Sequence, residues 1–317
     1  MVISLENEIT NYLSRCRFQK KLSPHSEKAY RIDLIQFSEF ISYETTGELN
    51  RENISSFIFK IQSSYKPKTV KRKIASLRAF FNNLVFEGLL DENPLVRINL
   101  RFREPFVLPK TIALSDVQKI FEVLYSELEC KSLLSVNNYE VIIRDIAILE
   151  LLFSTGIRIS ELCSLTVSDI NLITGVVTIH GKGAKERLVY IGNKNVVSAI
   201  REYYSIRIQK LTQTPFFFIN RLGNRLSEQS VRCMIRRCTS KAMVKQHITP
   251  HMFRHSFATL LLDEGVDIRY IQKILGHTSI VTTQIYTHVS SSKQKEILTE
   301  KNPRNKLQVG QSNGMDN

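Results

Sequence analysis

The sequence has 317 residues, of which 43% are hydrophobic, and its 44 lysines and arginines outnumber 30 aspartates and glutamates for a net charge of +14. This length allows two domains with cores of their own, and it excludes a minimal peptide that needs disulfides or metals to fold. The charge favours a polyanionic partner, most often a nucleic acid.

The cysteines and the N-terminus bear on location. The five cysteines are scattered and form no C-x-x-C pair, which is typical of reduced thiols in the cytosol. Residues 1–8 include acidic side chains and no long apolar core, and no window approaches the length of a membrane span. We therefore expect a cytoplasmic, soluble protein with no membrane partner.

The first hundred residues show a helical spacing of apolar side chains. The pattern predicts a helix over residues 5–16, a second after Ser23-Pro24, a third around residues 54–61 and a fourth from Lys66-Pro67 to about Gly88. Four amphipathic helices in succession predict an all-helical bundle.

A basic run opens the fourth of these helices, with no acidic residue between Lys66 and Arg78. One interpretation is a solvated helix face. In a strongly basic protein, a run at a helix start also favours contact with a phosphate backbone. The predicted DNA contacts here are Lys66, Lys68, Lys71, Arg72 and Lys73.

Residues 93–110 break the periodicity with three prolines and several basic residues, as in an extended linker. We place the domain boundary near residue 108, which gives domains 1–108 and 109–317.

The second domain begins with a predicted helix over about 114–128, and residues 141–153 are almost wholly apolar, as in a central buried helix. That helix is expected to end at Ser154-Thr155-Gly156. Arg158 then stands at the start of the next helix, beside backbone N–H groups that can receive an anion. The alternative for Arg158 is an ordinary surface arginine.

Two β-branched runs, residues 175–180 and 187–191, predict a hairpin joined by residues 181–186. Lys182 lies between two glycines in this connection, where it can approach another backbone closely. Residues 215–219 are expected to form a buried strand. A following helix presents a basic stripe suited to DNA: Arg232, Arg236 and Arg237.

Thr249 and Pro250 predict the start of a further helix, on which His251 and Arg254 share one face. The spacing of His251 and His255 also fits two zinc ligands. A zinc protease helix would carry a glutamate at Met252, however, and Arg254 would place a cation beside the metal. A core helix with polar residues at its rim is the other alternative.

The remaining elements are a helix from about Asp267 to Leu275, ending at Gly276-His277, and a last helical segment that carries Tyr286. The polar tail contains a short apolar patch at Ile297 and Leu298, and we expect disorder beyond Leu307.

Five motifs in this order resemble the tyrosine recombinases, most closely the Xer-like site-specific recombinases and the phage-type integrases. They are Thr155-Gly156-Ile157-Arg158 through Leu162, Gly181-Lys182-Gly183 through Arg187, His251-Met252-Phe253-Arg254 through Thr259, Leu275-Gly276-His277, and Tyr286-Thr287-His288. The resemblance covers nearly the whole chain.

The resemblance implies a mainly α fold, with a SAM-like helical core-binding domain and an α+β catalytic domain that contains a small antiparallel sheet. It implies that Tyr286 attacks the DNA phosphodiester to form a 3′-phosphotyrosine, and that Arg158 and Arg254 hold the phosphate oxygens. Lys182 is the implied general acid, His251 takes part in proton transfer, His277 binds the phosphate, and Glu161 orients the site. Neither a metal nor another cofactor is expected, and His255 is expected to be buried and structural.

The implied partner is double-stranded DNA with inverted-repeat core sites, bound by a homo- or heterotetramer, with accessory proteins as a possibility. The tail after Tyr286 is expected to dock on a neighbouring subunit as an exchange segment. Two alternatives stay open: a type IB topoisomerase-like enzyme that relaxes one duplex, and a DNA-binding regulator without catalysis.

Overall fold

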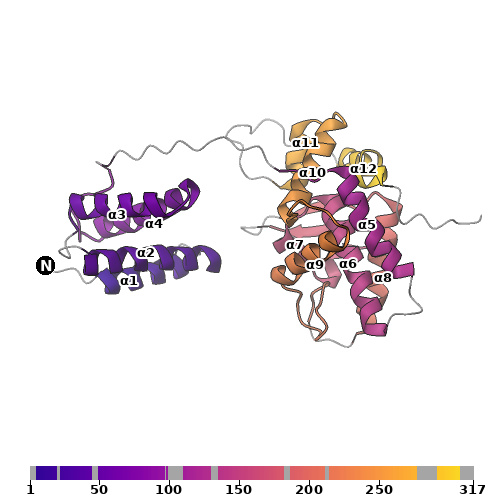
Figure 1. The fold of residues 1–317 in the computed structure, drawn as a ribbon, viewed down its shortest axis with the longest axis horizontal. Coiled ribbons are helices and arrows are strands. Elements are labelled where there is room, and N and C mark those ends of the chain that lie inside the picture. The colour runs from indigo at the N-terminus through magenta and orange to yellow at the C-terminus, as the bar shows by residue number, and fades with distance from the viewer. Residues whose placement is uncertain are drawn as a thin grey trace, which may run out of the picture. The chain divides into compact units, whose positions relative to one another are not determined.

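The computed structural model describes residues 5–19, 22–44, 49–96, 98, 110–129, 135–181, 186–210, 214–276 and 291–307. Its contacts divide the chain into two compact units, Met1–Val107 and Leu108–Asn317. Figure 1 labels the helices of both units. No helix among the described residues is both long enough and apolar enough to cross a membrane.

The described part of the first unit is a helical bundle of α1 (Leu5–Phe18), α2 (Pro24–Glu44), α3 (Arg51–Ser64) and α4 (Pro67–Phe86). The predicted bundle is therefore confirmed. Aromatic side chains from three of these helices fill its core: Phe37 meets Phe57 and Phe81 edge to face, with ring centroids 5.2 and 5.6 Å apart. Pro67 begins α4 at a position where its missing N–H costs no hydrogen bond.

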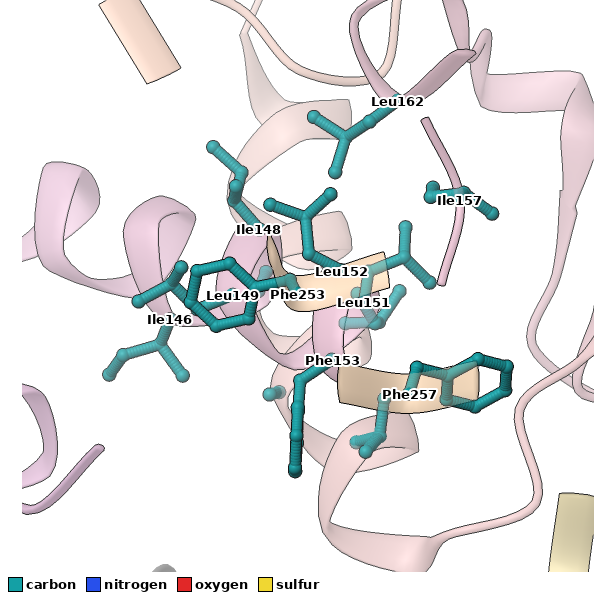
Figure 2. Close-up of a cluster of buried hydrophobic side chains, with 14 of the residues drawn as sticks. Ile146, Ile148, Leu149, Leu151, Leu152, Phe153, Ile157, Leu162, Phe253 and Phe257 are labelled. Atoms are coloured by element: carbon teal, nitrogen blue, oxygen red, sulfur yellow. The ribbon is translucent and has the colours of Figure 1, made fainter. Parts of the chain in front are cut away.

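The second unit is built around α6 (Val136–Thr155), which is buried along almost all of its last three turns. Figure 2 shows its side chains packed with Phe253 and Phe257 of α10. The remaining helices of this unit in the described residues are α5 (Leu114–Glu129), α7 (Ile159–Ser164), α8 (Lys194–Gln209), α9 (Glu228–Lys241), α10 (Pro250–Asp263), α11 (Ile268–Leu275) and α12 (Ser291–Glu300), with short 3₁₀ turns η2 (Val167–Asp169) and η3 (Pro303–Lys306).

A small antiparallel sheet lies in the same unit, as predicted. Strands β2 (Val176–His180) and β3 (Glu186–Tyr190) form the expected hairpin, with His180 opposite Glu186 at the end next to the connection. Strand β1 (Ile170–Asn171), which pairs with β2, was not predicted, because two residues are too few to show an alternating pattern.

The predicted strand over residues 215–219 is wrong. The structure has two isolated bridges there, Thr166 with Phe216 and Ile219 with Arg225. Phe217 and Phe218 are fully buried and pack on Tyr203 of α8. A short apolar run indicates that a segment is buried but not whether it forms a strand, so the sequence could not distinguish a strand from a buried loop.

The described part of the C-terminal segment packs on its own chain, and its docking on a neighbouring subunit stays a prediction. Ile297 and Leu298 are buried in the core of the second unit. The backbone of α12 comes so close to Gly192 that a Cβ there would lie 2.3 Å from the Leu298 carbonyl oxygen. The helix α12 begins at Ser291.

A buried ion pair fastens this segment to α6. The Arg304 guanidinium donates from Nε and Nη2 to the Glu150 carboxylate, at 2.6 and 2.7 Å, and both side chains are fully buried. The Tyr125 hydroxyl donates to the same carboxylate at 2.7 Å. Asn302 adds a hydrogen bond from its amide to the Ser154 carbonyl oxygen at 2.9 Å.

Replacing Arg304 by methionine should lower the free energy of unfolding by about 3–5 kcal/mol, because Glu150 would keep a buried charge without its main partner. Urea denaturation followed by circular dichroism measures this. Lys306→Ala is the matched control: that lysine pairs with Glu264 at the surface and should cost less than about 1 kcal/mol. Equal losses in both variants would contradict the prediction.

Gly156 ends α6 with a left-handed backbone, φ 61°, and a Cβ there would lie 2.6 Å from Phe257 Cδ1. Gly156→Ala should therefore combine a backbone cost of about 1–2 kcal/mol with overpacking of about 1–3 kcal/mol. Gly265→Ala isolates the first cost, since Gly265 has φ 74° and nothing within 4 Å of its Cβ position. If both variants denature at the same urea concentration, Phe257 moves aside at no cost and the packing argument fails.

Candidate active site

Arg158 lies where the chain leaves α6 and starts α7, at the N-cap of the shorter helix. Its Nη1 donates to Glu161 Oε1 at 2.8 Å, and its backbone N–H donates to the other oxygen of that carboxylate at 2.8 Å. Nη2 donates to the Gly276 carbonyl oxygen at 3.3 Å. The side chain remains 36% exposed, so a ligand can still reach the guanidinium.

Arg254 occupies the first turns of α10 and is buried. Its Nη1 donates to the Gly156 carbonyl oxygen at 2.8 Å and its Nη2 to the Leu275 carbonyl oxygen at 2.6 Å. The guanidinium thus joins the C-terminal ends of α6 and α11. Burial, followed by the nearby charge of Arg158, lowers the pKa of Arg254 to about 10, so the side chain stays charged at neutral pH.

The Glu161 carboxylate accepts hydrogen bonds from two arginines. Arg187 binds it in bidentate fashion, Nη1 to Oε1 at 2.8 Å and Nη2 to Oε2 at 2.7 Å, beside the contacts from Arg158. Burial acts to raise the pKa of Glu161, but the hydrogen bonds from Arg187 and Arg158 outweigh it and lower the pKa to about 2. The carboxylate is therefore ionised at all ordinary pH values.

Arg187 was not among the predicted site residues. Its Nε also donates to the Ile274 carbonyl oxygen at 3.0 Å, and its side chain is only 15% exposed. A signal was present, because Arg187 shares a strand face with the buried Val189, and a charge on an inner face needs a partner. Gly276 makes room for it: a Cβ there would lie 3.0 Å from Arg187 Cδ.

The site has a net charge of two positive units, because three guanidiniums stand against one carboxylate: Arg158, Arg187 and Arg254 against Glu161. The charges of Arg158, Arg187 and Glu161 all act on Arg254. Arg254 is hydrogen-bonded to carbonyl oxygens and is not paired with a carboxylate in the described residues. Such an excess of fixed, partly desolvated cations suits an anion such as a phosphodiester.

His251 is exposed in the first turn of α10, three residues before Arg254. His255 is exposed as well, so the expectation that it is buried is wrong. Residues four apart on a helix share a face, which puts His255 beside His251 and not opposite it. Partial burial, His251 and Arg254 lower the pKa of His255. The described residues contain no group of three or more metal-binding side chains that would complete a zinc site.

Three of the predicted catalytic residues, Lys182, His277 and Tyr286, lie outside the described residues. Their neighbours in the chain are placed: Gly181 follows β2, and Gly276 receives the Arg158 hydrogen bond. The described structure brings Arg158 and Arg254 together and puts His251 on the same helix as Arg254.

The predicted DNA contacts of the first unit divide into two groups. Lys66, Lys68, Lys71 and Arg72 are exposed at the start of α4. Lys73 is buried, and the prediction that it contacts DNA is wrong: its ammonium donates to Asp33 Oδ1 at 3.0 Å and to Gln36, and lies over the Tyr65 ring. Asp33 also accepts from Arg72.

In the second unit, Arg232, Arg236 and Arg237 are exposed along α9, as the basic stripe predicted. Arg232 pairs with Glu228 within the helix at 2.7 Å, and Arg237 pairs with the buried Asp145 of α6 at 2.5 Å. The ion pair with Asp145 therefore holds Arg237 in place, while about half of the arginine side chain stays exposed.

Comparison with known proteins assigns both units of the chain to known domain families. Residues 124–293 match the model of the phage integrase family, and residues 9–88 match its N-terminal SAM-like domain. A tyrosine recombinase of Agathobacter rectalis is 49% identical, with 95% of this chain and 98% of the relative covered. Tyrosine recombinase XerC of Thermodesulfovibrio yellowstonii is 39% identical over 94% and 97%.

Among solved structures, the XerH site-specific recombinase bound to its difH substrate before cleavage superposes with a TM-score of 0.67. The match covers 88% of this chain and 80% of that one at 22% identity, and it supports the fold. The arginine cluster stands on this fold, and the relatives match nearly end to end: the chain belongs to the phage integrase family of tyrosine recombinases and is an enzyme that breaks and rejoins DNA.

Proposed function

We propose that the chain cuts and rejoins DNA at specific sites through a 3′-phosphotyrosine on Tyr286. The observation that carries this proposal is the cluster of Arg158, Arg187 and Arg254 around Glu161, with its excess of positive charge. A regulator that only binds DNA would have no need of a buried Arg254 held by two carbonyl oxygens.

In the proposed reaction the Tyr286 phenol oxygen bonds to the scissile phosphorus as the bond to the 5′-oxygen breaks. His251 takes part in transfer of the phenol proton, and Lys182 gives a proton to the leaving 5′-oxygen. Arg158 and Arg254 bind the non-bridging oxygens and stabilise the charge of the transition state, with His277 as a further donor. The phosphotyrosine keeps the bond energy, so the reverse attack by a 5′-hydroxyl needs no ATP.

We further propose that the substrate is double-stranded DNA with inverted-repeat core sites. We also propose that the enzyme acts in the cytoplasm. The exposed cations of α4 and α9, Lys66, Lys68, Lys71, Arg72, Arg232, Arg236 and Arg237, would contact the DNA, largely its phosphates. Symmetric half-sites suit a symmetric assembly of identical or closely related subunits.

A tetramer follows from the chemistry, since exchange between two duplexes breaks four strands and each subunit offers one nucleophile. Exchange of the C-terminal segment between subunits belongs to the same proposal. In the assembly, α12 and η3 would occupy on a neighbour the site that they fill on their own chain, and Arg304 would pair with Glu150 of the partner subunit.

Tyr286→Phe should retain specific DNA binding and form no covalent adduct, because only the nucleophilic oxygen is lost. A nicked suicide substrate, resolved on a denaturing gel, measures the adduct, and a mobility-shift titration measures binding. A wild-type yield of adduct in the variant would assign the nucleophile to another residue.

Lys182→Ala should cleave an ordinary substrate on the order of a hundredfold more slowly or worse, since general acid catalysis contributes at least that much. A substrate with sulfur in place of the scissile 5′-oxygen should restore the rate, because a thiolate leaves without a proton. If sulfur helps the variant no more than it helps the wild type, Lys182 is not the acid.

A further inference from the structure

Arg225 is an exposed arginine that binds the last turn of α7 and precedes α9 in the chain. Its Nε donates to the Cys163 carbonyl oxygen at 2.7 Å, and its Nη2 donates to the Ser164 hydroxyl at 2.5 Å. The guanidinium also lies over the Phe216 ring, with Cζ 4.7 Å from the ring centroid. Contacts along one edge and on one face therefore hold this side chain in place.

The backbone at Arg225 is fixed as well. Arg225 forms an isolated bridge with Ile219, and the N–H of the next residue, Leu226, donates to the Phe218 carbonyl oxygen at 3.0 Å. Leu226, Phe218 and Ile219 are all buried. Because the ordering of side chains is one of the costs of binding, a guanidinium that is already ordered binds a ligand at a lower cost.

The charge of Arg225 is not balanced by a carboxylate. Its two acceptors, a carbonyl oxygen and a hydroxyl, are neutral, and it forms no ion pair within the part of the chain that the structure describes. Two arginines of α9 differ in this respect, because Arg232 pairs with Glu228 and Arg237 pairs with Asp145. A guanidinium carries N–H donors on three nitrogens, and the Nη1 donors of Arg225 meet no acceptor among the described residues.

A purely structural role for Arg225 is the alternative. An arginine beside the C-terminal end of a helix can bind the last carbonyl oxygens, and its charge interacts favourably with the helix dipole. Such a cap accounts for the contacts of Nε and Nη2 with α7. It leaves the Nη1 donors without a function, and these donors are the ones open to a ligand.

The helix α7 connects Arg225 to the arginine cluster. Arg158 is the N-cap residue of α7, and Arg225 binds the last two residues of the same helix. Six residues with a rise of about 1.5 Å each make this helix about 9 Å long. A DNA duplex carries a negative charge about every 1.7 Å along its axis, so a duplex held at Arg158 has further phosphates within that distance. This step rests on the phosphate-binding role proposed for Arg158.

We propose that Arg225 binds a phosphate of the DNA backbone near the scissile one, in addition to the contacts made by α4 and α9. Neutral acceptors orient the guanidinium, and its open Nη1 edge donates to the phosphate oxygens. Phosphate contacts fix the register of a protein on its duplex without reading the sequence. Arg225 thereby helps to place the scissile phosphate at the arginine cluster.

The test measures binding of the full-length protein to a short duplex of random sequence, because a phosphate contact does not depend on sequence. Fluorescence anisotropy gives the affinity between about 50 and about 200 mM salt. Arg225→Gln keeps an amide donor for the Cys163 carbonyl oxygen and loses the charge. The slope of log affinity against log salt should be about 0.9 smaller than in wild type, so the deficit in affinity should shrink about threefold over this range.

Two further variants separate the charge of Arg225 from its effect on folding. Arg225→Lys keeps the charge and loses the fork of donors, so it should bind more weakly than wild type but with the wild-type slope. Arg201→Gln is the matched control, because it removes the same charge from an exposed arginine of α8. This control should keep both the affinity and the slope of wild type.

A wild-type slope in Arg225→Gln would overturn the inference, since Arg225 would then only cap α7. The inference also fails if Arg225→Lys lowers the slope as much as Arg225→Gln, because the charge would not be the cause. Failure of the proposed function is read from a different measurement, the covalent adduct. A normal adduct yield in Tyr286→Phe would refute the proposed nucleophile and leave the binding result for Arg225 unchanged.

Discussion

The Glu161 carboxylate is the interaction on which the arrangement of the site depends. It accepts a bidentate pair from Arg187 of β3 and further hydrogen bonds from Arg158, so a helix start and a strand are tied to one point. Arg187 and Arg158 then reach the carbonyl oxygens of Ile274 and Gly276 at the end of α11. One acidic side chain thereby fixes three elements that are far apart in the sequence.

Arg254 completes the cluster in a different way. Its hydrogen bonds to Gly156 and Leu275 satisfy the donors without neutralising the charge. Carbonyl oxygens orient a guanidinium and leave its field available for an incoming phosphate, whereas a carboxylate would cancel it. The lowered pKa of Arg254 reflects the energetic cost of burying this charge beside Arg158, a cost that a bound anion would offset.

The sequence predicted the features whose signal is local. The apolar run of α6 and the two β-branched runs of the hairpin follow periodicities that do not depend on distant residues. The motifs identified Arg158 and Arg254, and the structure brings these two together. Three catalytic predictions, Lys182, His277 and Tyr286, lie outside the described residues and stay predictions.

What the sequence did not predict depends on partners that meet only in the fold. In the sequence, Lys73 is one more cation of a basic run. In the fold, it forms a buried ion pair with Asp33 of another helix. In the sequence, Arg304 is part of a polar tail. In the fold, it is buried in an ion pair with Glu150 of α6. The contact between Glu161 and Arg187 also crosses from a helix to a strand. For His255 the error was in the geometry of the helix itself, since its spacing from His251 already placed the two on one face.

The packing of the C-terminal segment has a consequence for the nucleophile. The described segments on either side of Tyr286 are Gly276, at the arginine cluster, and α12, whose backbone rests against Gly192. Both attachments belong to the same compact unit, and Arg304 locks the distal one. On the proposed role of Tyr286, a nucleophile carried between two fixed anchors would be an intramolecular reactant, and the anchors would set its effective concentration at the phosphate. Moving the distal anchor to another subunit would change that effective concentration without changing any residue of the cluster.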